Sequence, residues 1–202
     1  TGAKIVIGKH ITDVQTIFAP RFGADDVVAD GRAFDILIDE GDRLPFGGLE
    51  ISVVHTPGHT PADVSYRIGD ALFVGDTMFM PDYGTARADF PGGDARVLYR
   101  SIRKLLALSG DLRMFVGHDY LPDGRSDYRW ETSVADQRAH NIHVHDGIEE
   151  HDFVSMREAR DATLAPPTLF LPSLQVNIRA GALPPPEADG KRFLRLPITM
   201  AG

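Results

Sequence analysis

Three apolar runs, each typical of a buried strand, end in a tight turn and are followed by a side chain that can bind a metal. Those side chains are His59, Asp76 and His118. Imidazole and carboxylate groups are ligands for zinc and iron. If the three strands are neighbours in one sheet, their ends meet at one edge. The pattern therefore predicts a metal site made by His59, Asp76 and His118, in which Asp76 could bridge two ions.

The segment from His55 to Pro61 carries the first of these side chains. It follows a β-branched run at 51–54, and Pro57 and Gly58 then force an abrupt turn, since proline fixes φ and glycine tolerates unusual backbone angles. A lone histidine after a strand is more often solvated, and a lone Gly-Asp pair is usually a turn. The metal interpretation depends on the pattern that all three segments share.

The composition excludes several classes of function. The chain has 202 residues and a formal net charge of −8, which disfavours nucleic-acid or anionic-membrane partners. It contains no cysteine, so metal ligands must be His, Asp or Glu, and a reducing cytoplasm is the expected compartment. No apolar run approaches the length of a membrane span. We expect one α/β domain with a C-terminal appendage.

Hydrophobic periodicity predicts the elements that must position these side chains. We expect Asp94 to cap the helix at 95–108, and Gly47-Gly48 to turn the strand at 35–39 back into the strand at 49–54. An extended tail begins at Pro184-Pro185-Pro186. The other predicted strands are 4–8, 64–68, 71–74 and 112–116, and the other predicted helices are 10–18, 132–140 and 152–163.

Three segments resemble the later metal motifs of the metallo-β-lactamase superfamily: 56–60 (Thr-Pro-Gly-His-Thr), 74–77 (Val-Gly-Asp-Thr) and 116–120 (Val-Gly-His-Asp-Tyr). The resemblance covers the chain up to about Tyr120 and implies an αββα sandwich, here its C-terminal part, followed by a helical and extended appendage. It predicts one domain over 1–202, with the superfamily core at 1–125 and the appendage at 126–202. The segment 87–90 (Arg-Ala-Asp-Phe) and the 118–120 motif are similar to the iron-dependent persulfide dioxygenases within that superfamily.

The resemblance also implies roles for single residues. His59 and Asp76 correspond to two of the three iron ligands of the dioxygenases, and His118 to the second-metal histidine of the two-metal hydrolases. Arg87 corresponds to an arginine that meets the glutathione moiety, with a surface salt bridge as the equal alternative. Tyr120 lies where a pocket hydroxyl is expected. The implied cofactor is Fe(II), with Zn(II) as the alternative, and the implied partners are a glutathione-derived substrate and, in some forms, a second copy of the chain.

The superfamily's first motif, His-x-His-x-Asp-His, should precede the strand at 4–8 and is absent from the sequence. We therefore expect a fragment that is N-terminally incomplete and inactive by itself, from a parent enzyme that oxidises glutathione persulfide to sulfite and glutathione. A thioester hydrolase similar to glyoxalase II is the first alternative. A non-catalytic domain of the same fold is the second.

The remaining histidines have no comparable context. The run at 140–145 contains three of them, and we expect solvated imidazoles at a helix end. His10 and His151 belong to no recognisable motif.

Overall fold

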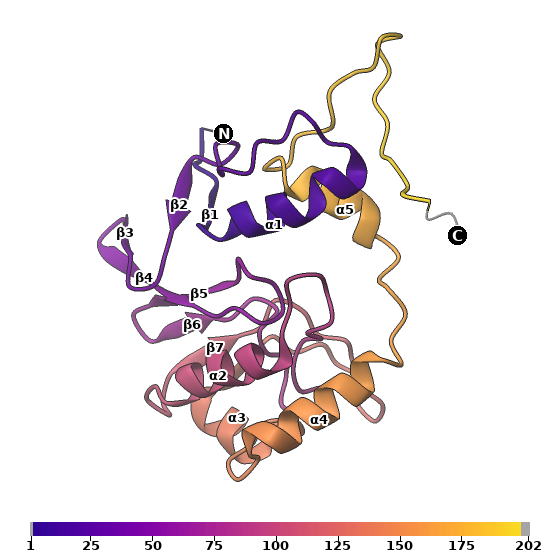
Figure 1. Cartoon of the computed structure of the whole chain (residues 1–202). Helices are drawn as coiled ribbons and strands as arrows, with labels where there is room; N and C mark the ends of the chain where they lie inside the picture. Colours follow the sequence, from indigo (N-terminus) through magenta and orange to yellow (C-terminus); the bar gives the residue numbers. More distant parts are fainter. Residues whose placement is uncertain (1, 199–202) are drawn as a thin grey trace.

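The computed structural model describes residues 2–198. In chain order the elements are β1 (Val6–Gly8), α1 (Ile11–Phe18), the 3₁₀ turn η1 (Pro20–Phe22), β2 (Ile36–Ile38), β3 (Arg43–Phe46), β4 (Leu49–His55), β5 (Val64–Ile68), β6 (Ala71–Phe73), α2 (Ala95–Leu106), β7 (Arg113–Phe115), β8 (Glu131–Ser133), α3 (Val134–His140), α4 (Glu150–Asp161) and α5 (Phe170–Asn177). Strands lie in the middle of the molecule, with α1 and α5 on one side and α2, α3 and α4 on the other (Figure 1).

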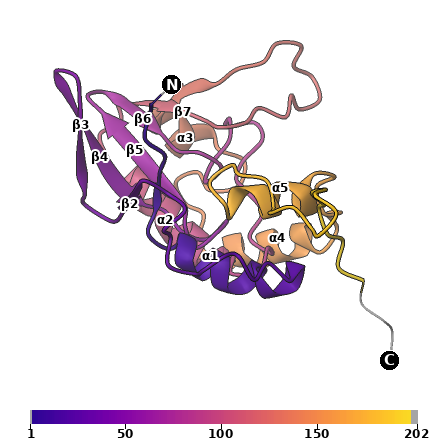
Figure 2. The same ribbon diagram turned by 90° about the horizontal axis from the view of Figure 1, so that it is seen from above.

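The strands form two sheets. β1 and β2 pair in parallel, with Val6 opposite Ile36. The larger sheet has the order β3-β4-β5-β6-β7-β8, in which only β6 and β7 are parallel neighbours. Because β5 is antiparallel to both β4 and β6, the strands β4, β6 and β7 all run in the same direction. Seen from above, β3 to β6 fan out on one side of the molecule, with α1, α4 and α5 on the other (Figure 2).

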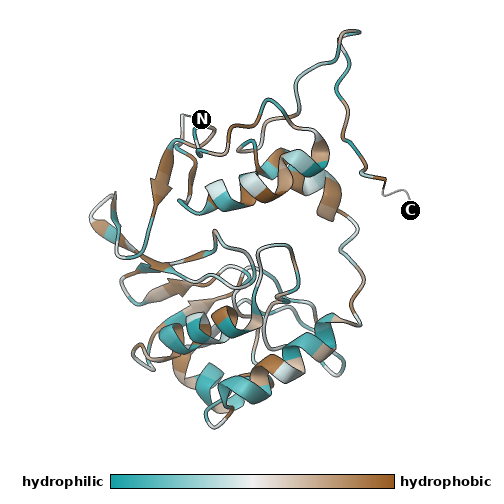
Figure 3. Cartoon of the chain, viewed as in Figure 1, coloured by the Kyte–Doolittle hydropathy of each residue, from teal (hydrophilic) through white to brown (hydrophobic). Residues whose placement is uncertain are grey.

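Two hydrophobic clusters hold the layers together. The larger joins β6, β7, α2 and α4, with Leu72, Leu98, Ile102 and Phe153 fully buried. The smaller surrounds α1 and contains Ile178 just after α5. In Figure 3, α2 and α4 turn hydrophilic residues outward, as expected for helices that cover a core from one side. α5 is largely hydrophobic, and its partly buried residues Phe170, Leu171 and Leu174 pack against the smaller cluster.

The α/β prediction is confirmed, and so is the cap of α2: the Asp94 carboxylate accepts a hydrogen bond from Val97 N at 2.9 Å. The extended tail is also present, and Gln175 holds it by exchanging two hydrogen bonds with the backbone of Arg195. Val134, Phe153 and Val154 pack in the larger cluster, although they follow residue 125. The boundary at 125 stays a prediction.

Three predicted elements were wrong in detail. The strand before the Gly47-Gly48 turn is β3, because a two-residue turn pairs the residues directly beside it, Phe46 with Leu49. The strand predicted at 35–39 instead gives β2, which pairs with β1. The helix predicted from residue 132 begins at Val134, since Ser133 caps it and Thr132 pairs in β8.

The helix α5 was not predicted. It contains Pro172, and proline normally argues against a helix. Here the proline lies in the first turn, where the missing N–H removes no helical hydrogen bond. No helix within residues 2–198 combines the length and the apolar character that crossing a bilayer requires.

Candidate functional site

The three predicted metal ligands follow β4, β6 and β7, which run in one direction, so their side chains reach the same edge of the larger sheet. Asp76 lies between the two imidazoles. Its Oδ2 is 3.9 Å from His59 Nε2, and its Oδ1 accepts a hydrogen bond from His118 Nδ1 at 2.5 Å. The carboxylate thus occupies the position that a bridging ligand would take between two histidines.

A tight loop places His59. Gly58 has a φ of +133°, and a Cβ atom there would lie 2.3 Å from the backbone of Leu98 in α2, so the turn packs directly onto the helix. The loop is held by Asp94 N, which donates to Gly58 O, and by Ser101 Oγ, which donates to Pro57 O at 2.6 Å. The rigid core of α2 therefore sets the position of this loop.

The ring of His59 is oriented by a backbone carbonyl. Its Nδ1 donates to Arg87 O at 2.8 Å, which leaves Nε2 as the nitrogen with the lone pair, on the side of Asp76. Metal-binding histidines are commonly held in this way by an acceptor on the other nitrogen. The donor set of His59 Nε2 and Asp76 Oδ2 therefore fits a divalent metal of the zinc or iron type.

His118 is less enclosed, with 56% of its side chain exposed. Its loop approaches the Asp76 loop closely: Gly117 N donates to Gly75 O, and a Cβ on Gly117 would lie 3.1 Å from Asp76 Oδ1. Within residues 2–198, the donor atoms of His59, Asp76 and His118 do not all lie within 4.8 Å of one another. The three donors form a row with Asp76 in the middle.

An additional carboxylate, which the sequence patterns did not indicate, lies beside the metal-binding loop. Asp63 accepts hydrogen bonds from the backbone N and the hydroxyl of Thr60 at 2.9 and 2.7 Å. Desolvation raises the pKa of Asp63, opposed by the neighbouring His59 and by these hydrogen bonds. The one sequence signal for Asp63 is its position four residues after His59, close enough for the two side chains to belong to one site.

A cavity of about 270 Å³ opens beside His59 and Asp76. Both predicted substrate-binding residues line it. Tyr120 is half exposed and stacks on Tyr83, with ring centroids 4.9 Å apart. Desolvation raises the pKa of its phenol, so the hydroxyl stays protonated at neutral pH. The cavity combines aromatic walls with hydroxyl and cationic groups, as small-molecule sites commonly do.

Arg87 lines the same cavity, but other groups of the protein already occupy its guanidinium. The guanidinium makes two hydrogen bonds to Asp89, at 2.6 and 2.7 Å, and another to Ala165 O. The Asp89 carboxylate raises the pKa of Arg87, which stays charged. This geometry gives Arg87 an internal salt bridge and a role in orienting His59 through its carbonyl.

Two further arginines from α4 line the cavity, and the sequence analysis did not identify them. Arg157 is 1% exposed and is paired with Asp161 and with Thr85 O, while burial lowers its pKa. Arg160 is exposed, and its side chain has no hydrogen-bond or ion-pair partner within residues 2–198. Arg160 is thus the cation at this cavity that is available to a ligand.

The histidine run at 140–145 differs from the expectation. His143 is only 8% exposed, and its Nδ1 accepts a hydrogen bond from Thr85 N at 3.1 Å. Burial, with Arg157 and Arg160 nearby, lowers the pKa of His143 to about 4, so the ring is neutral at pH 7. The prediction of solvated imidazoles was wrong here because the segment folds against the 84–85 turn. His140 is exposed, as expected.

Asp119 has a structural role in the loop after His118. Its carboxylate makes two hydrogen bonds of 2.5 Å to the guanidinium of Arg125 and accepts another from Arg129 N. The hydrogen bonds from Arg125 are the main reason that the pKa of Asp119 is lowered to about 2. This pair closes the loop that carries His118 and Tyr120.

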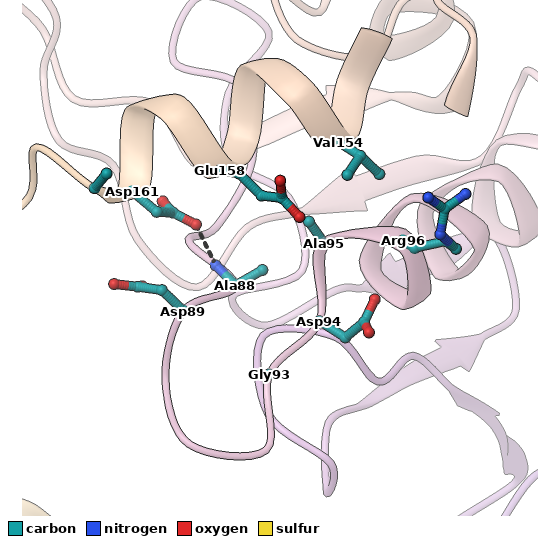
Figure 4. Close-up of a pocket in the computed structure, with 10 residues that line it drawn as sticks. Ala88, Asp89, Gly93, Asp94, Ala95, Arg96, Val154, Glu158 and Asp161 are labelled. Atoms are coloured by element: carbon teal, nitrogen blue, oxygen red, sulfur yellow. Dashed lines mark hydrogen bonds between the residues drawn. The ribbon is translucent and has the colours of Figure 1, made fainter. Parts of the chain in front are cut away.

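A larger cavity, of about 460 Å³, lies outside this site (Figure 4). Ala88 N donates there to Asp161 Oδ2 at 2.8 Å, and Asp94 and Glu158 add further carboxylates. Neither His59 nor Asp76 lines it. The segment 86–90 separates the two cavities, because Arg87 and Phe90 line the first whereas Ala88 and Asp89 line the second.

Comparison with known proteins identifies the family of this chain. Residues 3–118 match the model of the metallo-beta-lactamase superfamily. The chain is 52% identical over 98% of its length to a probable metallo-hydrolase of Burkholderia pseudomallei, of which it covers 70%, and 46% identical over 97% of its length to glyoxylase B2 of Dictyostelium discoideum, of which it covers 68%. The crystal structure of ETHE1 from Myxococcus xanthus matches 74% of this chain and 62% of its own, with 32% identity and a TM-score of 0.66.

The relatives are longer than this chain. It spans about half, 46%, of several other bacterial relatives. Superfamily members bind divalent metals, which agrees with the donors on either side of Asp76. The matched segment, residues 3–118, contains the strands β1 to β7 and the candidate donors His59, Asp76 and His118. The chain belongs to the metallo-β-lactamase superfamily, in the branch that contains ETHE1 and the glyoxalase II-like proteins.

Proposed function

We propose that the protein to which this chain belongs is a persulfide dioxygenase that acts on glutathione persulfide. The persulfide, dioxygen and one water would become sulfite and glutathione, so that the terminal sulfur is oxidised and dioxygen is reduced. The observation that supports this proposal best is the pairing of a His59–Asp76 donor set with a cavity lined by three arginines. Metal donors and an available cation, Arg160, at one cavity suit a charged sulfur substrate.

His59 Nε2 and Asp76 would hold the metal, with His118 on the other side of the carboxylate. Bound iron would supply coordination positions for the persulfide sulfur and for dioxygen. The protein's own contribution is to fix the His59 ring through Arg87 O and to enclose the reacting sulfur between Phe79, Phe90 and Tyr120. The hydroxyl of Tyr120 would donate a hydrogen bond to the substrate from the cavity rim.

The carboxylates of glutathione would bind on the α4 side of the cavity. Guanidinium groups suit carboxylates because they can donate two parallel hydrogen bonds. We propose Arg160 as the direct partner, since its side chain is exposed and carries no other ion pair within the described residues. Arg87, engaged by Asp89, would contact the ligand only at the expense of that pair.

A metal-dependent thioester hydrolase is the second candidate. The row His59–Asp76–His118 favours it, because a carboxylate between two histidines suits a two-metal site that activates water. The similarity to proteins named metallo-hydrolase and glyoxylase points the same way. The two candidates share the site and differ in metal and reaction.

The decisive experiment measures metal content, oxygen uptake with glutathione persulfide, and cleavage of a glutathione thioester. It uses the longest natural form of the protein that contains these residues. Iron with persulfide-dependent oxygen uptake supports the dioxygenase, and loss of that uptake in Asp76→Asn assigns it to this site. Zinc with thioester cleavage and no oxygen uptake would overturn it in favour of the hydrolase. Neither activity in a metal-loaded protein would overturn both.

A further inference from the structure

A second group of metal-binding side chains lies outside the cavity of the candidate site. It consists of His10, Asp39 and His55, and one potential ligand atom from each lies within 4.8 Å of the others. Among residues 2–198 this is the only group of three or more His, Asp or Glu side chains that comes so close together. None of the three residues lines the cavity of about 270 Å³. The group therefore needs its own explanation.

The three residues come from three different elements. His10 stands between β1 and α1, Asp39 follows β2 directly, and His55 is the last residue of β4. β1 and β2 form the small parallel sheet, whereas β4 belongs to the larger sheet. The group thus lies where the small sheet meets the large one, and an ion held there would connect the two.

Each imidazole is already oriented by an acceptor on one nitrogen. His10 Nδ1 donates to Asp13 Oδ2 at 2.8 Å, and His55 Nε2 donates to Pro61 O at 3.0 Å. These hydrogen bonds leave the lone pairs on His10 Nε2 and His55 Nδ1. A carboxylate or carbonyl behind a ligating histidine is the usual support of a metal site. Both histidines have that support here, although no metal motif in the sequence includes His10.

The rings of His10 and His55 stack with centroids 4.7 Å apart and planes inclined by 8°. Because a metal ion lies in the plane of each imidazole that binds it, one of the two stacked rings must turn before both nitrogens can bind the same ion. Lys9 forms a close ion pair with Asp39 Oδ2, and this hydrogen bond lowers the pKa of Asp39, which keeps the carboxylate ionised and leaves Oδ1 free of that pair. The positive charge of Lys9 also opposes a cation, so affinity must come from the two nitrogens.

We propose that His10, Asp39 and His55 form a binding site for a divalent transition-metal ion, of which Zn(II) fits best, that fastens the β1–β2 sheet to β4. Two imidazoles and one carboxylate match the ligands that zinc accepts, whereas calcium and magnesium prefer oxygen alone. Ligand atoms around tetrahedral zinc lie about 3.3 Å apart. All three side chains are partly exposed, and closing the present spacing requires them to rotate and the His10–His55 stack to open.

The role of the site is structural. Because its ligands come from two sheets, binding must stabilise the folded chain relative to the unfolded one. Water would complete the coordination.

The test is titration of the chain with zinc chloride after the candidate active site has been disabled by Asp76→Asn with His118→Ala. We expect one zinc ion per chain in that background and a higher midpoint of thermal unfolding in its presence. His10→Ala and His55→Ala should each weaken binding at least about 10-fold and abolish the thermal shift. Asp13→Asn, which alters the support of His10 without removing a ligand, should weaken binding by less.

His151→Ala is the matched control. His151 is exposed, and within residues 2–198 its side chain contacts only the carboxylate of its neighbour Asp152, so zinc binding should be unchanged. Circular dichroism of the metal-free variants shows whether each one folds. If His10→Ala does not fold, Asp39→Asn, which preserves side-chain volume, carries the same expectation. Absence of zinc binding in the disabled background, or binding that survives His10→Ala or Asp39→Asn in a folded chain, overturns the proposal.

Discussion

The two histidine–carboxylate groups of this chain use the same kinds of donor in different surroundings. His59 and Asp76 line a cavity with aromatic and cationic walls, whereas His10, Asp39 and His55 lie where two sheets meet and line no part of that cavity. A single short loop separates His55 from His59. The comparison teaches that donor chemistry alone does not indicate catalysis: a metal beside a cavity can meet a substrate, and a metal between sheets can only hold them together.

Substitution of Asp76, the carboxylate between His59 and His118, should distinguish the candidate active site from the His10–Asp39–His55 group most clearly. We expect Asp76→Asn to reduce both activity and metal affinity at the cavity at least about 100-fold, because even partners of metal ligands cost about 10- to 100-fold. Asp39→Asn should leave the activity per folded molecule unchanged. Activity assays with metal analysis check both variants, and equal losses in the two would mean that the groups are not independent.

The stability of the fold should be especially sensitive to added side-chain volume at Gly58, in the loop between His55 and His59. Gly58→Ala should destabilise the fold by about 2 to 5 kcal/mol, because its φ is +133° and the new methyl group would meet the Leu98 backbone. Gly47→Ala is the control. Its φ is +60°, but apart from its chain neighbours no atom lies within 4 Å of an added Cβ, so we expect it to destabilise the fold by about 1 kcal/mol. Urea unfolding measures both. Similar costs would show that α2 does not position the loop.

His143, which accepts a hydrogen bond from the cavity residue Thr85, should make the stability of the fold depend on pH. Its folded-state pKa, about 4, is below the ordinary value of 6.5, so the unfolded chain binds the proton more readily. The stability it contributes is present above pH 6.5 and is lost as the pH falls from 6.5 to 4, by at most about 3 kcal/mol. His143→Gln should flatten that part of the unfolding profile. His151→Gln, at an exposed position, should leave it unchanged.

The smallest effect on stability is expected from Lys104, which contacts the start of the 55–59 loop from its exposed side. Lys104 Nζ donates to His55 O at 2.8 Å and to Glu40 Oε2 at 3.1 Å. Because the ion pair is about half exposed, Lys104→Ala should cost less than about 1 kcal/mol, and less still in high salt. Unfolding at two salt concentrations checks this. A cost that is larger and independent of salt would mean that this contact, too, fixes the loop.

Much of the fold could be predicted because local signals were consistent. Apolar runs separated by turn residues located β4, β5 and β6, and the spacing of Leu98, Ile102 and Leu105 located α2. The hairpin partner of β4, which is β3, and the start of α3 were missed. Both depend on single turn and capping contacts, and those contacts move element boundaries by a few residues without changing the periodicity.

The candidate site shows the same division. His59, Asp76 and His118 were found because each follows a strand, and the structure brings His59 and His118 to opposite sides of Asp76. Arg157, Arg160 and the buried state of His143 were missed, since they depend on how α4 and the 140–145 segment pack against residues 84–87. Nothing in the local sequence specifies which distant segment will cover a polar residue.

By itself the sequence determined which side chains end the strands of the larger sheet, because alternation and turn chemistry act over a few neighbouring residues. Only the tertiary structure decided that Arg87 would bond to the backbone of Ala165, that Arg160 would stay available, and that His10 and Asp39 would meet His55. Those outcomes depend on contacts between segments far apart in the chain. Packing, solvent exclusion and charge set them together, and none of the three can be evaluated until the fold is known.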